Sequence, residues 1–249
     1  MVNNRNEIVE HYKDGTIKVI GCVEEEQVEV GSYDTRGSQI GNLSQIYLDY
    51  IGYKTNGYYV EVGGYDGISW SNTYGLAKLG WSGLIFEPQN FFFEKCVDNY
   101  KNYSNVKIEK CCIGNYNGDI DLYVAGPLTT TSKEMVDVYK TLDFSKGLFQ
   151  GDLYPISSKI YKLDNMLEKH NCPINFDILV IDVEGAEYEV LKGFSINEWK
   201  PKMMIIELHE QYQNENIKIN DKNINELMEK HNYKKIHSDS INSIFVLKI

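Results

Sequence analysis

The feature that most constrains the fold of this chain is the stretch from Tyr58 to Thr73, where an apolar run stops abruptly in glycines. The first five residues are rich in β-forming side chains, and Gly63, Gly64 and Gly67 follow them. Glycine adopts positive φ without a steric penalty and lets a ligand approach the backbone closely. Ser71-Asn72-Thr73 then provides residues that commonly cap a helix. The stretch predicts a strand, a tight loop and a helix that together cradle a nucleotide-like ligand.

A second apolar strand is predicted at residues 82–87, and it ends in Glu87, twenty positions beyond Gly67. An acidic side chain at this place accepts hydrogen bonds from both hydroxyls of a ribose. The glycines lack the Gly-x-Gly-x-x-Gly order that nicotinamide cofactors require, and Glu61 precedes them. An acidic residue at the end of a strand, followed by Gly-x-x-x-Gly, resembles the S-adenosylmethionine loop of Rossmann-like methyltransferases.

The composition of the chain limits the classes of partner that it is expected to bind. The net charge of −11 argues against binding of nucleic acid through electrostatic attraction to its phosphate groups. No apolar run approaches the roughly 18 residues of a membrane span, and no signal peptide is evident, so we expect a soluble, cytoplasmic protein. The five cysteines include no C-x-x-C pair, which disfavours a zinc site or a disulfide framework. Cys111 and Cys112 are expected in the core, with Cys112 close to the cofactor pocket.

Strands and helices alternate from residue 40 to residue 111, beginning with a helix at 40–51 and including strands at 58–62, 82–87 and 106–111. Right-handed crossovers make such a sheet parallel and bring the Gly63 loop and Glu87 into one crevice. Gln39, in the polar segment before the first helix, is expected to reach the same crevice.

The remaining segments are less regular. Asp14-Gly15, ahead of β-rich runs at 16–20 and 27–30, predicts an N-terminal hairpin within residues 1–31. Residues 119–124 read as another hairpin strand. Residues 126–160 show little of the periodicity of a strand or a helix, and they are expected to form an insertion over the pocket. A short helix is predicted at 161–170, a polar surface segment at 214–225, a helix at 224–231, and strands at 233–237 and 243–247.

A second acidic constellation follows two more apolar strands. The strand at 176–182 ends in Asp182-Val183-Glu184, and the strand at 203–208 ends around Glu207 and His209. Continuous hydrophobicity indicates strands covered on both faces. Neighbouring parallel strands end at the same sheet edge, so these four groups are expected beside the cofactor. They suit either a general base or an oxygen-and-nitrogen site for Mg²⁺ or Mn²⁺.

Together these segments resemble the FkbM family of S-adenosylmethionine-dependent methyltransferases, from roughly residue 38 to residue 210. The motifs that carry the resemblance are Tyr59–Gly67, Ser71-Asn72-Thr73, Gly80–Gly83, Ile85–Pro88, Ile181–Glu187 and Val190–Phe194. Ile181–Glu187 is the most specific of them. Gly63-Gly64-Tyr65 departs from the commoner Gly-Ala-Asn, which keeps the loop glycine but puts a bulky ring near the methionine end.

The resemblance implies a Rossmann-like class I methyltransferase fold, with a mostly parallel seven-stranded sheet and helices on both faces. The length of the chain predicts one domain over residues 1–249, with the hairpin extension at 1–31 and a lid-like insertion at 126–160 on the acceptor side. These two segments carry none of the family's motifs. The implied cofactor is S-adenosylmethionine, with adenine near Cys112 and Ile113. The residues expected to bind it are Gln39, Glu61, Gly63, Gly64, Asp66, Gly67, Ser71, Asn72, Thr73, Glu87, Pro88, Cys112, Ile113 and Asp182.

The implied reaction is O-methylation of a hydroxyl on a sugar or glycan. Asp182, Glu184, Glu207 and His209 are the candidate catalytic residues, and a base formed by Asp182 and His209 is favoured. The alternative is Mg²⁺ or Mn²⁺ held by Asp182, Glu207 and His209, because acidic residues after these strands hold Mg²⁺ in catechol-type O-methyltransferases.

Other functions stay open at this point. The acceptor can instead be a small secondary metabolite, or the chain can be a module that binds a nucleotide ligand without catalysis. A dinucleotide-dependent epimerase or reductase is disfavoured, because the chain lacks Gly-x-Gly-x-x-Gly and an obvious Tyr-x-x-x-Lys pair after the fourth strand.

Overall fold

The computed structural model describes residues 7–11, 17–22, 31–149, 154–209, 212 and 214–248. The chain divides into two units, Met1–Ser32 and Tyr33–Ile249, and each is described by itself. In the first unit, strand β1 (Glu7–His11) pairs antiparallel with β2 (Ile17–Cys22). The expected hairpin is present and the strand expected at 16–20 is confirmed as β2, but its partner is β1, because the turn signal Asp14-Gly15 falls between these two strands. The strand expected at 27–30 lies outside the described residues.

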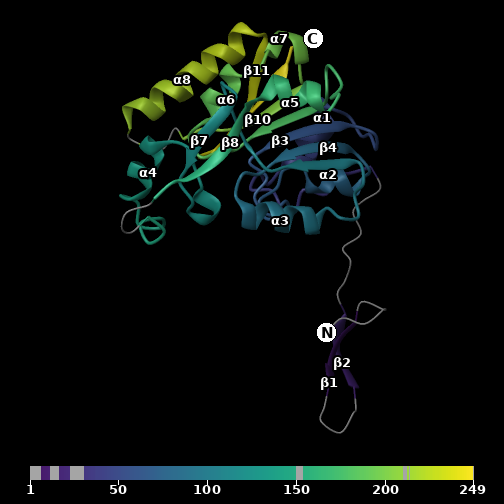
Figure 1. The fold of residues 1–249 in the computed structure, drawn as a ribbon. Coiled ribbons are helices and arrows are strands. Elements are labelled where there is room, and N and C mark those ends of the chain that lie inside the picture. The colour runs from purple at the N-terminus through teal and green to yellow at the C-terminus, as the bar shows by residue number, and fades with distance from the viewer. Residues whose placement is uncertain are drawn as a thin grey trace. The chain divides into compact units, whose positions relative to one another are not determined.

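The second unit is built on a seven-stranded sheet with the strand order β11-β12-β10-β9-β3-β4-β5 (Figure 1). Its strands are β3 (Tyr58–Val62), β4 (Ser82–Phe86), β5 (Val106–Glu109), β9 (Ile178–Ile181), β10 (Met203–Glu207), β11 (Tyr233–Ser238) and β12 (Asn242–Leu247). The pairs from β5 to β10 are parallel, and β12 runs antiparallel to both of its neighbours. The predicted mostly parallel sheet is confirmed.

Helices cover both faces of this sheet, which explains why its central strands β9 and β10 are buried over their whole length. One face packs against α1 (Leu43–Tyr50), α2 (Tyr74–Lys78) and α3 (Asn90–Asn99). The other packs against α5 (Leu163–Lys169), α6 (Glu187–Lys192), α7 (Ile196–Trp199) and α8 (Glu215–Lys230). Figure 1 shows α8 on one side of the sheet and α2 and α3 on the other. Every helix within the described ranges is too short or too polar to cross a lipid bilayer.

Helix α8 begins earlier than the sequence suggested. The expected polar surface segment at 214–225 is wrong, because α8 starts at Glu215 and runs unbroken to Lys230. The Asn214 side chain caps it by accepting hydrogen bonds from the backbone N–H groups of Asn216 and Ile217. Ile217 and Ile224 are buried on one side of the helix, so a narrow apolar stripe holds an otherwise polar helix to the fold.

The segment between β5 and α5 contains a second, three-stranded sheet with the order β6-β8-β7. Its elements are β6 (Cys112–Gly114), β7 (Gly118–Leu122), the 3-10 helix η1 (Gly126–Leu128), α4 (Lys133–Tyr139) and β8 (Ile156–Lys162). The predicted hairpin strand at 119–124 is present as β7, but β8 separates it from β6. The last part of the 126–160 insertion is therefore a regular strand, and α5 begins at Leu163 and not at Tyr161.

Candidate active site

The carboxyl ends of β3, β4, β9 and β10 border a cavity of about 460 Å³. The segment 126–131 lines it too, together with Tyr139, Phe144 and Leu148. The crevice predicted at this sheet edge is therefore present, and the first part of the insertion forms one of its walls. Ligands of parallel α/β sheets bind at this edge.

The glycine loop after β3 is pinned to the end of β4. The backbone N–H groups of Gly63 and Gly64 both donate to the carbonyl oxygen of Phe86, at 3.0 Å each. Gly63 has φ +94°, and a Cβ built there would lie 1.7 Å from the carbonyl oxygen of Asp182. Only glycine fits between these two strand ends, and this close approach brings the loop and Asp182 to one wall of the cavity.

Glu87 is buried at the tip of β4 and held by the backbone. Its Oε2 accepts from the N–H of Tyr65 at 2.9 Å, and its Oε1 accepts from the N–H of Gln89 at 2.7 Å. Burial raises the pKa of Glu87 to about 7, although these two hydrogen bonds lower it. Each carboxylate oxygen keeps a free lone pair, so the group is oriented to accept two further hydrogen bonds.

Glu61 is a second buried carboxyl group, at the end of β3. Its Oε2 accepts from the Thr73 hydroxyl at 2.7 Å, and the Ser71 hydroxyl lies 3.5 Å from Oε1. Burial raises the pKa of Glu61 to about 8, against the lowering effect of the Thr73 hydrogen bond. The segment 71–73 therefore positions Glu61, which lines the cavity.

Most of the residues that sequence analysis expected at the site line the cavity: Gln39, Glu61, Gly63, Gly64, Ser71, Asn72, Glu87, Pro88, Cys112, Ile113, Asp182, Glu184 and Glu207. Asp66, Gly67, Thr73 and His209 do not. Asp66 accepts hydrogen bonds from the backbone N–H groups of Ile68 and Ser69, and these bonds stabilise the conformation of the loop. Gly67 faces the ring of Tyr100, which a Cβ would approach to 2.6 Å.

The loop after β9 is organised by Glu187, which sequence analysis did not single out. Its Oε1 accepts from the backbone N–H groups of Val183 and Gly185, at 3.1 and 3.0 Å. Glu184 sits between them with φ +56°. The insertion holds Glu184 from the other side, because the Tyr139 hydroxyl donates to its Oε2 and the Thr130 hydroxyl donates to its carbonyl oxygen at 2.6 Å.

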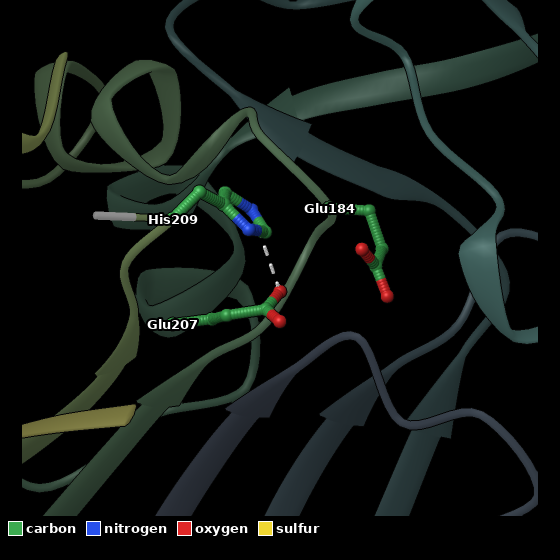
Figure 2. Close-up of side chains that lie close together, drawn as sticks. All are labelled: Glu184, Glu207 and His209. Carbon is green, nitrogen blue, oxygen red and sulfur yellow. Dashed lines mark ion pairs between the residues drawn. The ribbon is translucent and has the colours of Figure 1, made fainter. Parts of the chain in front are cut away.

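Glu184, Glu207 and His209 lie together at the ends of β9 and β10 (Figure 2). Nε2 of His209 is 3.6 Å from Oε2 of Glu207 and 4.0 Å from Oε2 of Glu187. Burial lowers the pKa of His209 to about 4, so its imidazole is neutral at pH 7. Burial raises the pKa values of Asp182, Glu184 and Glu207, and the two glutamates are raised further by the neighbouring Asp182.

An aromatic group formed by Tyr65, Trp70 and Phe92 lies beside the cavity, and only the Tyr65 ring was expected there from the sequence. The Tyr65 ring lies 5.5 Å from the Trp70 ring and 4.0 Å from the Phe92 ring, between centroids. Tyr65 and Trp70 both have positive φ, at 47° and 60°, which is unusual for bulky residues. The only signal in the sequence was the position of Tyr65 inside the glycine loop. Tyr139 and Tyr212 line the cavity without any local motif.

Comparison with solved structures finds similar chains. The "METTL16 MTase domain" aligns at TM-score 0.49 and 11% identity, over 97% of this chain and 87% of that chain. The "delta-N METTL16 MTase domain" aligns at 0.44 and 13% identity, over 82% and 80%. A precorrin-6y C5,15-methyltransferase from Geobacter metallireducens GS-15 aligns at 0.41 and 10% identity, over 82% and 87%. No curated protein matches the chain.

The comparison with protein families gives a match that spans most of the second unit. The pattern of the Methyltransferase FkbM domain matches residues 61–235, from Glu61 in β3 to Lys235 in β11. This range includes the glycine loop, Glu87 and the acidic loop after β9. It also covers well over half of the 249 residues. The chain therefore belongs to the FkbM methyltransferase family.

Proposed function

We propose that this protein transfers a methyl group from S-adenosylmethionine to a hydroxyl of a sugar or glycan. The observation that carries the proposal is the arrangement of one cavity, with two buried carboxyl groups beside a glycine loop and an acidic cluster at the next strand ends. The fold of the family implies S-adenosylmethionine as the cofactor. The residues fit it, because Glu87 is fixed by two backbone N–H groups and still has lone pairs that face the cavity.

We assign each part of the cofactor to residues that line the cavity. Glu87 accepts hydrogen bonds from the ribose hydroxyls. Glu61 and Ser71, with the Gly63 loop, receive the methionine end, where a carboxylate complements an ammonium group. Cys112 and Ile113 provide an apolar wall for adenine.

The bound cofactor supplies an electrophilic methyl group. The acceptor oxygen forms the new C–O bond as the C–S bond breaks, and the hydroxyl proton must go to a base. Asp182 is suited to that role, because it lines the cavity and burial raises its pKa toward a more basic carboxylate. His209 does not line the cavity and its pKa is lowered to about 4, so we assign proton uptake to Asp182 alone.

The acceptor side supports a polar, hydroxyl-rich substrate. Thr129, Thr130 and Thr131 line the cavity close to Tyr139 and Phe144. Hydroxyls beside aromatic rings suit a sugar, which presents both polar edges and apolar faces. A small secondary metabolite remains the second candidate, since a cavity of about 460 Å³ also accepts one.

The test is a radiolabelled methyl-transfer assay on nucleotide sugars, oligosaccharides and small hydroxylated metabolites, with calorimetry for cofactor binding. We expect transfer to a carbohydrate, and a loss of at least a hundredfold in Asp182→Asn with cofactor binding retained. Transfer only to a metabolite would support the second candidate. Cofactor binding without transfer to any acceptor, or full activity in Asp182→Asn, would contradict the mechanism.

A further inference from the structure

We infer that Glu184, Glu207 and His209 form a binding site for a divalent cation of the Mn²⁺ class. The three residues offer two carboxylate oxygens and one imidazole nitrogen, and these ligand atoms lie within 4.8 Å of one another. Ligands at about 2.1 Å from a shared ion lie at most about 4.2 Å apart, so a small side-chain adjustment closes the site. The ligand set differs from that expected from the sequence, which had Asp182 in place of Glu184.

Unpartnered buried atoms point to an ion. Oε2 of Glu207 and both ring nitrogens of His209 are buried and have no hydrogen-bond partner among the described residues. His209 is only 2% exposed and Glu207 only 9%. Buried polar atoms in native proteins nearly always have a partner, and an imidazole with neither nitrogen satisfied is costly. Figure 2 shows the His209 ring facing the Glu207 carboxylate, at a distance too long for a hydrogen bond.

The carboxyl groups around these atoms also lack a cationic side chain as partner among the described residues. Asp182, Glu184, Glu187 and Glu207 are gathered at two strand ends, and within the part of the chain that the structure describes none of them pairs with a lysine or arginine. Buried carboxylates are normally paired with a cation or coordinate a metal. An ion of charge +2 at this point would compensate two of them.

Neighbouring residues hold the proposed ligands in place. The Tyr139 hydroxyl donates to Glu184, and the Tyr212 ring stacks on the His209 ring with centroids 5.5 Å apart. Glu187 fixes the backbone of the loop that carries Glu184. Such outer contacts are typical of metal sites, where they fix the orientation of each ligand.

The role of the ion rests on the proposed function. Glu184 and Glu207 line the cavity, so an ion bound to them can also bind the acceptor oxygen. A cation bound there would lower the pKa of that hydroxyl, and Asp182, whose carboxyl group contacts that of Glu207, would accept the proton. The site itself exists or fails independently of the acceptor.

The test measures Mn²⁺ binding alone, without cofactor or acceptor. The full chain is stripped with a chelator and titrated with MnCl₂, using calorimetry and the loss of the free Mn²⁺ electron paramagnetic resonance signal. We expect one ion per chain, and an affinity at least tenfold weaker in both Glu184→Gln and Glu207→Gln. The matched control is Glu189→Gln, in α6 near the loop, whose carboxylate contacts Lys192 and Asn115 and not the cluster. It should bind Mn²⁺ like the unaltered protein.

Thermal unfolding tests whether the variants are folded. The Gln variants remove carboxylates that lack a cationic partner, so without metal they should melt no lower than the unaltered protein, and Mn²⁺ should no longer raise their melting temperature. Absence of Mn²⁺ binding, or equal affinity in both Gln variants and the control, would overturn the site. Mn²⁺ binding in a protein that transfers no methyl group would contradict only the proposed function. Full methyl transfer in the presence of chelator would contradict the role of the ion in the reaction.

Discussion

At the scale of single residues, two buried carboxyl groups line the cavity beside the glycine loop. Glu87 and Glu61 end neighbouring strands, and both are buried with hydrogen bonds that orient them. Their pKa values of about 7 and about 8 mean that each is substantially protonated near neutral pH. A ligand that donates hydrogen bonds or carries positive charge therefore draws them into the ionised form.

We expect Glu87→Ala to weaken S-adenosylmethionine binding by about 1.5–3 kcal/mol, roughly tenfold to a hundredfold, because two ribose hydroxyls lose a charged acceptor. Calorimetry measures this directly. Glu94→Ala, in an exposed part of α3, serves as the control. Equal affinity in the two variants would place the ribose elsewhere.

Cofactor affinity should also depend on pH. Hydrogen bonds from the ribose favour the ionised form of Glu87, so binding releases a proton and affinity rises as the pH rises through the pKa of about 7. Between pH 6 and pH 8 the gain from one such group is about tenfold. In Glu87→Gln the rise should shrink to the part contributed by Glu61. An affinity that falls with pH would contradict this assignment.

At the scale of elements, two segments gain their structure from distant contacts. The polar start of α8 is held by the Asn214 cap and by Ile217, which packs into the same apolar cluster as Met135 and Tyr139 of the insertion. Met135 also lies against Gly185, where a Cβ would approach it to 2.0 Å. The insertion, the loop after β9 and the start of α8 are thus packed as one wall.

Removing the cap should destabilise this wall. Asn214→Ala leaves two backbone N–H groups of α8 without their acceptor, and we expect a loss of about 1 kcal/mol in the free energy of unfolding. Chemical denaturation measures it. Asn214→Ser retains a capping oxygen and should recover most of the loss, whereas equal stability of the two variants would show that the cap contributes nothing.

The insertion itself should serve the acceptor more than the cofactor. Replacing residues 133–149 by a short Gly-Ser linker removes Tyr139, Phe144 and Leu148 from the cavity but leaves Glu61 and Glu87 in place. We expect methyl transfer to be lost while calorimetry still detects S-adenosylmethionine binding. Loss of cofactor binding in a variant that still unfolds cooperatively on heating would show a different role for this segment.

At the scale of the whole molecule, a charged network at the opposite edge of the sheet ties the strand starts together. Asp177, before β9, accepts from Lys54, Lys202 and the backbone N–H of Tyr58. Burial alone would raise the pKa of Asp177, but the hydrogen bonds from the two lysines and Tyr58 outweigh it, and its pKa is lowered. Three segments far apart in the sequence are thereby joined at the amino ends of β3, β9 and β10.

A lowered pKa means that this network stabilises the fold above the unfolded-state pKa of about 3.9, and that the stabilisation is lost as the pH falls through the native pKa. Asp177→Asn should therefore cost about 1–3 kcal/mol at pH 7 and progressively less below about pH 4. Urea denaturation at both pH values measures the difference. Asp98→Asn, which breaks an exposed ion pair with Lys101, should change little. A pH-independent cost would mean that packing and not charge is responsible.

Much of the site could be predicted from the sequence. Glu61, Glu87, Asp182 and Glu207 each stand at the end of an apolar run. Parallel strands with right-handed crossovers bring such ends to one edge, so position along the chain was enough to predict that these groups meet. The number of seven strands came from the family resemblance, whereas the alternation of strands and helices predicted the parallel pairing of the first three central strands.

The sequence by itself therefore determined the parallel pairing of the central strands and the acidic residues at the carboxyl edge of the sheet. Only the tertiary structure decided that His209 lies behind the cavity wall, that Tyr65 and Trp70 adopt positive φ, and that β8 inserts between β6 and β7. The physical reason is the range of the interactions. Periodicity and strand ends are local properties of the chain, whereas side-chain direction, strained backbone conformations and the pairing of distant strands depend on packing between segments that are remote in sequence.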